Sequence, residues 1–262
     1  MRSVECLLAV SVLTASANAA QFKLTASDAA EADEFGFSVA VSGDVAVVGA
    51  RFDDDLGFSS GSAYVFRRVG GQWVEQAKLT ASDGAAYDFF GWAVAIDGDT
   101  IVVGAPQGGG DAGKVYVFQH TGSVWMEQVK LVADDPQRRV IAFGTAVAID
   151  SDRIVVGAPF SEVSFTPTGS SYVFRRAGAA WSQEAVLAPA VDVLNDRFGA
   201  SVAIRGDVAG VPDWARLGVR VPERWRCLGR GDEACQREYQ LPGAIRSRDR
   251  RRRPDDRRWR AR

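Results

Sequence analysis

The chain carries a repeat of about 54 residues, and this periodicity restricts the fold more than any other sequence feature. Phe-Gly pairs open four units and follow one another at steps of 55, 53 and 55 residues. Val-Gly-Ala, Tyr-Val-Phe, a Trp nine residues after each Tyr, and Lys-Leu recur between them in constant order. Such self-similarity is typical of architectures in which each unit packs on its neighbours. The residues that define the repeat are Phe35, Gly36, Gly49, Phe90, Gly91, Gly104, Pro106, Phe143, Gly144, Gly157, Pro159, Phe198 and Gly199.

Each unit predicts four short strands, which in the first unit cover 38–41, 45–49, 63–67 and 73–80. The second strand is continuously apolar, as expected when both faces are covered, and the fourth alternates in part, which indicates one wet face. No segment has a helical period. Four-strand units of this length favour an all-β chain folded as a β-propeller. Independent hairpins or a β-solenoid are the alternative, although solenoid repeats are shorter.

The landmark residues suit the contacts between blades. A Phe supplies a large apolar anchor, and the Gly beside it allows a neighbouring backbone to approach closely. Gly-Ala at the end of the second strand leaves room at a crowded edge. Trp73, Trp125 and Trp181 hold a fixed repeat position, which favours packing at a strand edge over the alternative of a ligand-stacking ring.

The combination of Phe-Gly with Val-Gly-Ala-Pro, at Val103–Pro106 and Val156–Pro159, resembles the FG-GAP repeat of integrin-α-type β-propellers. The first unit departs from it, with Arg51 in the place of the Pro. The resemblance covers about 21–209, with repeat starts near 35, 90, 143 and 198. It implies a secreted, extracellular or surface-bound propeller (or a periplasmic one), usually of seven blades, that acts in binding and adhesion.

The resemblance also implies that the ring is incomplete here. The chain supplies about three and a half blades, preceded by an orphan strand at Phe22–Ala26 that resembles the last strand of a blade. An open arc would leave two apolar blade faces exposed. Self-association through these faces is one expected outcome, and instability is the other.

Many members of the family bind calcium through an Asp-x-Asp-x-Asp-Gly loop. The corresponding turns here are Ser42-Gly43-Asp44, Asp97-Gly98-Asp99, Asp150-Ser151-Asp152 and Arg205-Gly206-Asp207. Two carboxylates at most are too few for an ion that takes six to eight oxygen ligands, so we predict plain hairpin turns and no cofactor. The weak metal candidates are Asp53, Asp54 and Asp55, for which a solvated acidic loop is the favoured interpretation.

Residues 1–20 resemble an export signal, with an apolar stretch from Leu7 to Leu13 and a small-x-small pattern at Ala17–Ala19. A buried first strand or helix is the alternative. Cleavage after Ala19 or Ala20 would remove Cys6 and leave no cysteine in the repeats, which suits an exported protein without disulfides. The body has no run of 18 apolar residues, which argues against a membrane span there.

Residues 210–262 differ in composition from everything before them. They hold 16 Arg and 8 acidic residues, whereas 1–209 hold 15 basic and 25 acidic ones. Read one frame over, Arg226–Cys235 can encode a sequence close to Gly71–Thr80, and Ile245-Arg246 can encode Phe-Gly. We therefore interpret the segment as a disordered, frameshifted remnant. The alternative is a genuine basic tail that binds nucleic acid or anionic surfaces, but the acidic body and the export signal argue against nucleic acid.

Two further motifs favour ordinary structural interpretations. Arg205-Gly206-Asp207 spells an integrin-binding tripeptide, but Gly-Asp belongs to the repeat at this turn, so chance explains it. His120 is the only histidine. It falls in a turn without a nucleophile nearby in sequence, which indicates a surface residue and no catalytic triad.

The sequence therefore predicts an exported binding or adhesion module without catalysis or identifiable catalytic residues. Its ligand, an extracellular protein or glycan, would meet the loops at 28–34, 53–60 and 83–88, because loops carry function where a scaffold repeats. A non-functional product of a broken gene and the accessory propeller of a secreted hydrolase are the alternatives.

Overall fold

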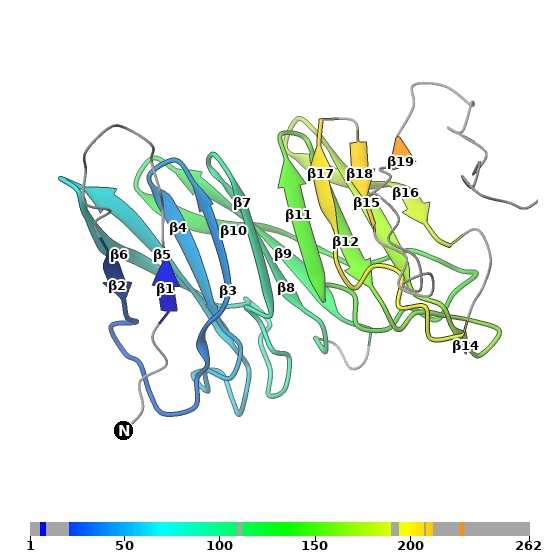
Figure 1. The fold of residues 1–262 in the computed structure, drawn as a ribbon, viewed down its shortest axis with the longest axis horizontal. Coiled ribbons are helices and arrows are strands. Elements are labelled where there is room, and N and C mark those ends of the chain that lie inside the picture. The colour runs from blue at the N-terminus through cyan, green and yellow to red at the C-terminus, as the bar shows by residue number, and fades with distance from the viewer. Residues whose placement is uncertain are drawn as a thin grey trace, which may run out of the picture.

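The computed structural model describes residues 6–8, 21–108, 112–189, 194–206, 208–211 and 226–227. The described residues form strands and connecting loops, with no helix among them. Three four-stranded antiparallel sheets stand side by side along the molecule (Figure 1). This arrangement confirms the all-β fold of incomplete propeller blades that the sequence predicts.

The blades follow the repeat. Blade 1 consists of β3 (Phe35–Ser42), β4 (Val45–Ala50), β5 (Ser62–Val69) and β6 (Gln72–Leu79). Blade 2 consists of β7 (Ala93–Asp97), β8 (Thr100–Ala105), β9 (Lys114–Thr121) and β10 (Val124–Leu131). Blade 3 consists of β11 (Ala146–Asp150), β12 (Arg153–Ala158), β15 (Ser170–Ala177) and β16 (Ala180–Leu187). Blade 4 is the sheet β17 (Ala203–Arg205), β18 (Val208–Gly210) and β19 (Arg226–Cys227).

Two local features differ from the prediction. β3 begins at Phe35, three residues earlier than expected, because Phe35 pairs with Ala50 across a register shift before Ser38. The loop of blade 3 contains an additional hairpin, β13 (Glu162–Val163) and β14 (Thr166–Pro167). Its turn places Ser164 and Phe165 at positive φ of 49° and 66°. The sequence offers none of the usual glycine or asparagine signals for that conformation there.

The core lies between the blades. Alternate residues of β4 face opposite neighbours, so Val45 and Val47 pack with blade 2, whereas Ala46 and Val48 pack with Leu24 and the other residues in front of blade 1. The same division recurs in β8 and β12. The continuously apolar second strand is therefore explained by burial on both faces, as predicted.

The Phe-Gly landmarks join consecutive blades. Phe90 is fully buried and meets Tyr116 and Phe118 edge to face, at 5.4 and 6.0 Å between ring centroids. Phe35 and Phe143 make the same pair of contacts in their own blades. The Phe90 amide donates to the Ser60 carbonyl of blade 1 at 2.9 Å.

The glycines allow the backbones of neighbouring blades to touch. A Cβ on Gly49 would overlap the carbonyl oxygen of Gly91, and the same overlap would occur between Gly104 and Gly144. Any side chain at these positions would force the blades apart. A glycine at these positions is what permits the two backbones to approach this closely.

The repeated tryptophans pack at the outer strands. Trp125 is buried, and Trp73 and Trp181 are half-buried against the core. The Trp125 indole donates across the blade boundary to Gln76 Oε1 at 3.4 Å. Edge packing is thus their role in the structure.

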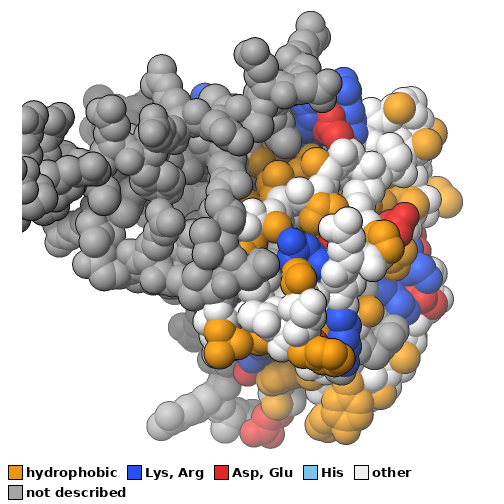
Figure 2. All heavy atoms as spheres, turned by 90° about the vertical axis from the view of Figure 1, so that its right-hand side faces the viewer, with side chains coloured by type: hydrophobic (Ala, Val, Ile, Leu, Met, Phe, Trp, Pro, Cys, Tyr) orange, Lys and Arg blue, Asp and Glu red, His pale blue; other side chains and the backbone are white. Residues whose placement is uncertain are grey.

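The orphan strand is present at the N-terminal end. β2 (Phe22–Leu24) pairs with β1 (Cys6–Leu8), and Leu24 and Ala26 enter the core in front of blade 1. The predicted signal segment lies outside the described residues except for β1, and the aberrant tail lies outside them except for 210–211 and β19. Figure 2 views the opposite end of the molecule, where hydrophobic side chains are scattered over the described surface among polar ones.

Candidate binding face

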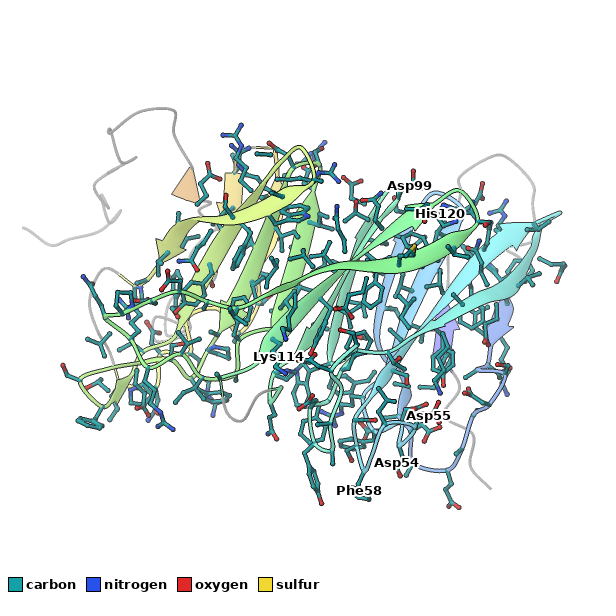
Figure 3. All side chains as sticks on the ribbon, turned by 180° about the vertical axis from the view of Figure 1, so that it is seen from behind. Asp54, Asp55, Phe58, Asp99, Lys114 and His120 are labelled. Carbon is teal, nitrogen blue, oxygen red and sulfur yellow. The ribbon has the colours of Figure 1, made fainter. Side chains whose placement is uncertain are left out.

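The three loops proposed from the sequence lie together at one end of blade 1 and its boundary with blade 2. Phe52 donates its amide to the Asp33 carbonyl at 3.2 Å, and Tyr87 donates to the Phe58 carbonyl at 2.8 Å. Figure 3 shows Asp54, Asp55 and Phe58 at this end, whereas Asp99 and His120 lie at the opposite end. We refer to the surface formed by 28–34, 53–60 and 83–88 as the loop face.

A lysine at the end of β6 ties two of these loops to the blade. The Lys78 ammonium lies 2.7 Å from Asp28, 2.9 Å from Asp53 and 2.5 Å from Asp55. The Tyr64 hydroxyl is 2.7 Å from Asp28 Oδ1 and 2.9 Å from Asp53 Oδ2. One cation and one phenol therefore organise three carboxylates.

Burial disfavours the charged forms of Asp53 and Lys78, but the hydrogen bonds within the cluster shift their pKa values further in the opposite direction. Burial alone would raise the pKa of Asp53, yet the bonds from Lys78, the Asp55 amide, Tyr64 and Ser62 hold that pKa below its usual value. Burial would lower the pKa of Lys78, and the carboxylates raise it instead. The pKa of the Tyr64 hydroxyl is raised by burial and by the neighbouring Asp28. Asp28, Asp53 and Lys78 thus keep their charges at neutral pH, and Tyr64 keeps its proton.

Asp53 differs from the solvated loop predicted for it. It is 3% exposed, because its carboxylate accepts from Ser62, Tyr64 and Lys78 inside the loop. Asp54 and Asp55 are exposed as expected. Carboxylate oxygens of Asp28, Asp53 and Asp55 lie within 4.8 Å of one another, and the Lys78 ammonium bonds to all three.

The same tie recurs at the next blade boundary. Asp83 accepts from Tyr116 at 2.7 Å, from Lys130 at 2.7 Å and from Lys114 at 2.9 Å. The bonds from Lys130, Lys114 and Tyr116 hold the pKa of Asp83 well below its usual value. At the third boundary Tyr172 lies 3.3 Å from Asp135, and burial raises its pKa to about 12.

Sequence reasoning missed this Asp–Tyr–Lys tie, although its signal was available. The Tyr belongs to Tyr-Val-Phe and the Lys to Lys-Leu, which are repeat landmarks, and each Asp follows Lys-Leu at a fixed distance. Repetition of all three residue types indicates a contact between repeats. Their proximity depends on the blade packing, which the sequence does not display.

An aromatic pair stands on the loop face. Phe58 is 62% exposed and Tyr87 is 54% exposed, and their ring centroids are 5.3 Å apart. Leu56, on the same loop as Phe58, is also exposed. The backbone bond between Tyr87 and Phe58 holds the two loops in register. Exposed aromatic side chains on a fixed backbone are suited to burying apolar area against a ligand at low entropic cost.

The turns compared with calcium loops use their carboxylates between blades. Asp97 accepts from the Ser151 amide at 2.7 Å, and Asp150 accepts from the Gly206 amide at 2.6 Å. Ser42 accepts from the Gly98 amide in the same way at 3.2 Å. Gly206 belongs to the Arg-Gly-Asp tripeptide, so its amide is engaged by the preceding blade. Asp207 lies outside the described residues.

His120 differs from the exposed residue predicted for it. Its side chain is 13% exposed and packs on Trp125 at 4.9 Å between ring centroids. Its Nδ1 lies 3.9 Å from Asp99, and its Nε2 has no hydrogen-bond partner. The position is paired with a Trp across β9 and β10, which brings the ring against the sheet surface.

Comparison with known proteins identifies the family. The sequence model of the FG-GAP repeat matches three tandem segments, 19–66, 73–118 and 125–174. These segments cover more than half of the chain, and the chain therefore belongs to the FG-GAP repeat family. FG-GAP repeats form propellers that generally act as non-catalytic binding modules and are commonly extracellular or surface-bound.

Other comparisons are less informative. No curated protein matches the sequence. Among solved structures, "Crystal structure of the Saccharomyces cerevisiae Sqt1" is similar at a TM-score of 0.40 and 11% identity, over 69% of this chain and 43% of that one. The chain thus spans less than half of the length of that protein. In the described part of the chain, no helix is long and apolar enough to span a membrane.

Proposed function

We propose that the chain is an exported or surface-bound module that binds an extracellular protein or glycan through its loop face. The observation that carries the proposal is the exposed pair Phe58 and Tyr87, held side by side by a backbone hydrogen bond. The Lys78 cluster supports the proposal, because its bonds to Asp53 and Asp55 fix the loop that presents Phe58. The membership in a family of binding modules agrees with this assignment.

The chemistry of the face favours adhesion over catalysis. Asp28, Asp53 and Asp83 are engaged by Lys78, Lys114 and Lys130, and the pKa values of these three carboxyl groups are held low, which suits stable charges and not proton transfer. His120 lies at the opposite end of the blades, against Trp125. The proposal assigns the chain neither a catalytic step nor a cofactor.

Substitution of the aromatic pair tests the proposal. The full chain is measured by biolayer interferometry against immobilised fibronectin and fibrillar collagen, and on a glycan array. The double variant Phe58→Ala/Tyr87→Ala is expected to lose at least tenfold in affinity for whichever probe the parent chain binds, as expected for hot-spot aromatics. Phe165→Ala is the matched control, because it removes an exposed phenyl from blade 3. Equal binding by the double variant and the parent chain would refute the loop face as the binding site.

A further inference from the structure

The front face of blade 1 exposes an apolar stripe. Val39 and Val41 on β3 are 46% and 41% exposed, whereas Phe37, in the register shift before them, packs on Trp92 of blade 2 at 5.2 Å between ring centroids. The residues at the positions of Val39 and Val41 in blade 2 are Val94 and Ile96, and each is 9% exposed. Their burial comes from blade 1, which packs against them. The stripe on β3 therefore corresponds to the surface of blade 2 that blade 1 covers.

Blade 4 carries the surface that corresponds to the covering side of the contact between blades 1 and 2. Between blades 1 and 2 the covering residues include Ala40, Val45 and Val47. In the fourth repeat the same positions hold Ala203, Val208 and Gly210, with Ala203 exposed and the other two half-buried. Val202 and Ile204 point the opposite way, into the contact with blade 3. Among the described residues, no further blade packs on the Ala203 side.

β2 takes the position of an outer strand, and β1 is the one other described strand in its sheet. The connection of β2 to blade 1 repeats the contact between blades 1 and 2, because Ser27 bonds to Glu75 through its amide and hydroxyl as Ser82 bonds to Glu127. β2 also lies beside β6 as β6 lies beside β10. In blade 4, by contrast, the described residues form three strands, and none of the three takes the outer position.

The register of β1 indicates how β2 becomes accessible. β1 pairs Cys6 with Leu24, and in blade 1 the third strand pairs Ala63 with the corresponding Leu79. β1 thus occupies the place of a third strand beside β2. It belongs to the predicted export signal, and cleavage after Ala19 or Ala20 would free that edge of β2.

We propose that a second copy of this chain docks head to tail at these two ends. Blade 4 of one copy then covers Val39 and Val41 of the other copy, and β2 of that other copy becomes the outer strand of this blade. Figure 1 shows β2 and β17 at opposite ends of the arc, so one copy does not bring the two halves together. Such a contact is heterologous, since different surfaces of the two copies meet. A second copy is the favoured occupant because each end matches a surface that the chain itself carries.

The test uses size-exclusion chromatography with light scattering on the full chain produced with its export signal processed. The parent chain is expected to elute at no less than twice the monomer mass. Val39→Asp and Ala203→Asp should each give monomers, because each places a carboxylate in one half of the interface. An equimolar mixture of the two variants should associate again, because Val39→Asp retains an intact blade 4 and Ala203→Asp retains an intact β3.

The controls separate this interface from other associations. Val74→Asp places the same charge on the exposed outer strand β6 and should leave the mass of the assembly unchanged. Circular dichroism checks that each variant is folded, and Ala203→Asp carries the test if Val39→Asp fails to fold. A monomeric parent chain, or assemblies that persist in both variants, would overturn the proposal. A mixture that remains monomeric would also overturn it, since head-to-tail contact requires complementation.

Discussion

Replacement of Gly104 by Ala tests whether contact between blade backbones determines the fold. Within an isolated strand, this change should stabilise the protein by roughly 0.5–1 kcal/mol, because Gly loses more conformational entropy than Ala on folding. Here the new Cβ would overlap the Gly144 carbonyl oxygen and lie 3.0 Å from the carbonyl carbon. The obstacle is backbone of the next blade and cannot rotate away, as the end of a side chain could.

The expected sign is therefore reversed. Separating two packed blades to admit a methyl group should cost about 3 kcal/mol, the upper part of the range for overpacked cores. A loss of this size lowers the melting temperature by roughly 6–12 °C in a chain of this length. The measurement is thermal and urea unfolding, followed by tryptophan fluorescence and far-UV circular dichroism.

Gly98→Ala is the matched control. Gly98 lies in a surface turn with nothing within 4 Å of a new Cβ, and its φ is 53°. Only the left-handed backbone is penalised there, by about 1 kcal/mol. If Gly104→Ala were no more destabilising than Gly98→Ala, the argument that the repeated glycines serve blade contact would be wrong.

Three further predictions concern the contacts between blades. Lys78→Met should lower the free energy of unfolding in urea by about 3 kcal/mol, because the buried Asp53 carboxylate loses its cationic partner. Lys130→Met should lower it by less than about 1 kcal/mol, because Lys130 is more exposed and Lys114 still contacts Asp83. Equal losses in the two variants would contradict this prediction. Asp83→Asn should lower stability at neutral pH by about 1 kcal/mol, a value reduced for partial exposure. Because the pKa of Asp83 in the folded chain lies below its unfolded value of 3.8, its contribution to stability is present above pH 3.8 and disappears as the pH falls through the folded pKa. The stability curves of the parent chain and the variant should therefore converge in acid. A stability difference independent of pH would refute the assignment. Asp97→Ala removes the acceptor of the Ser151 amide and should cost about 1 kcal/mol, and hydrogen exchange should accelerate at that amide and not at the Gly98 amide, which donates to Ser42.

The sequence alone determined the blades and their order. Phe35, Phe90 and Phe143 recur with Val-Gly-Ala and Tyr-Val-Phe at nearly constant spacing, and each set reappears as one sheet. A repeat can be recognised in the sequence because every copy must satisfy the same packing constraints. Recurrence of a residue at one position therefore indicates a packing contact that a single copy would not reveal. The anchoring role of the Phe and the close approach at the Gly followed from side-chain size alone.

Only the tertiary structure decided which charges meet. Asp28, Asp53 and Lys78 are separated by 25 residues at each step. They converge because Asp28 follows an outer strand, whereas Asp53 and Lys78 come from the next blade. Likewise Phe58 and Tyr87 carry no periodic signal, and their pairing depends on how two loops cross at a blade boundary. The spacing of landmarks fixes local strands, but contacts between loops depend on how one blade is placed against the next, and that placement arises only when the blades pack.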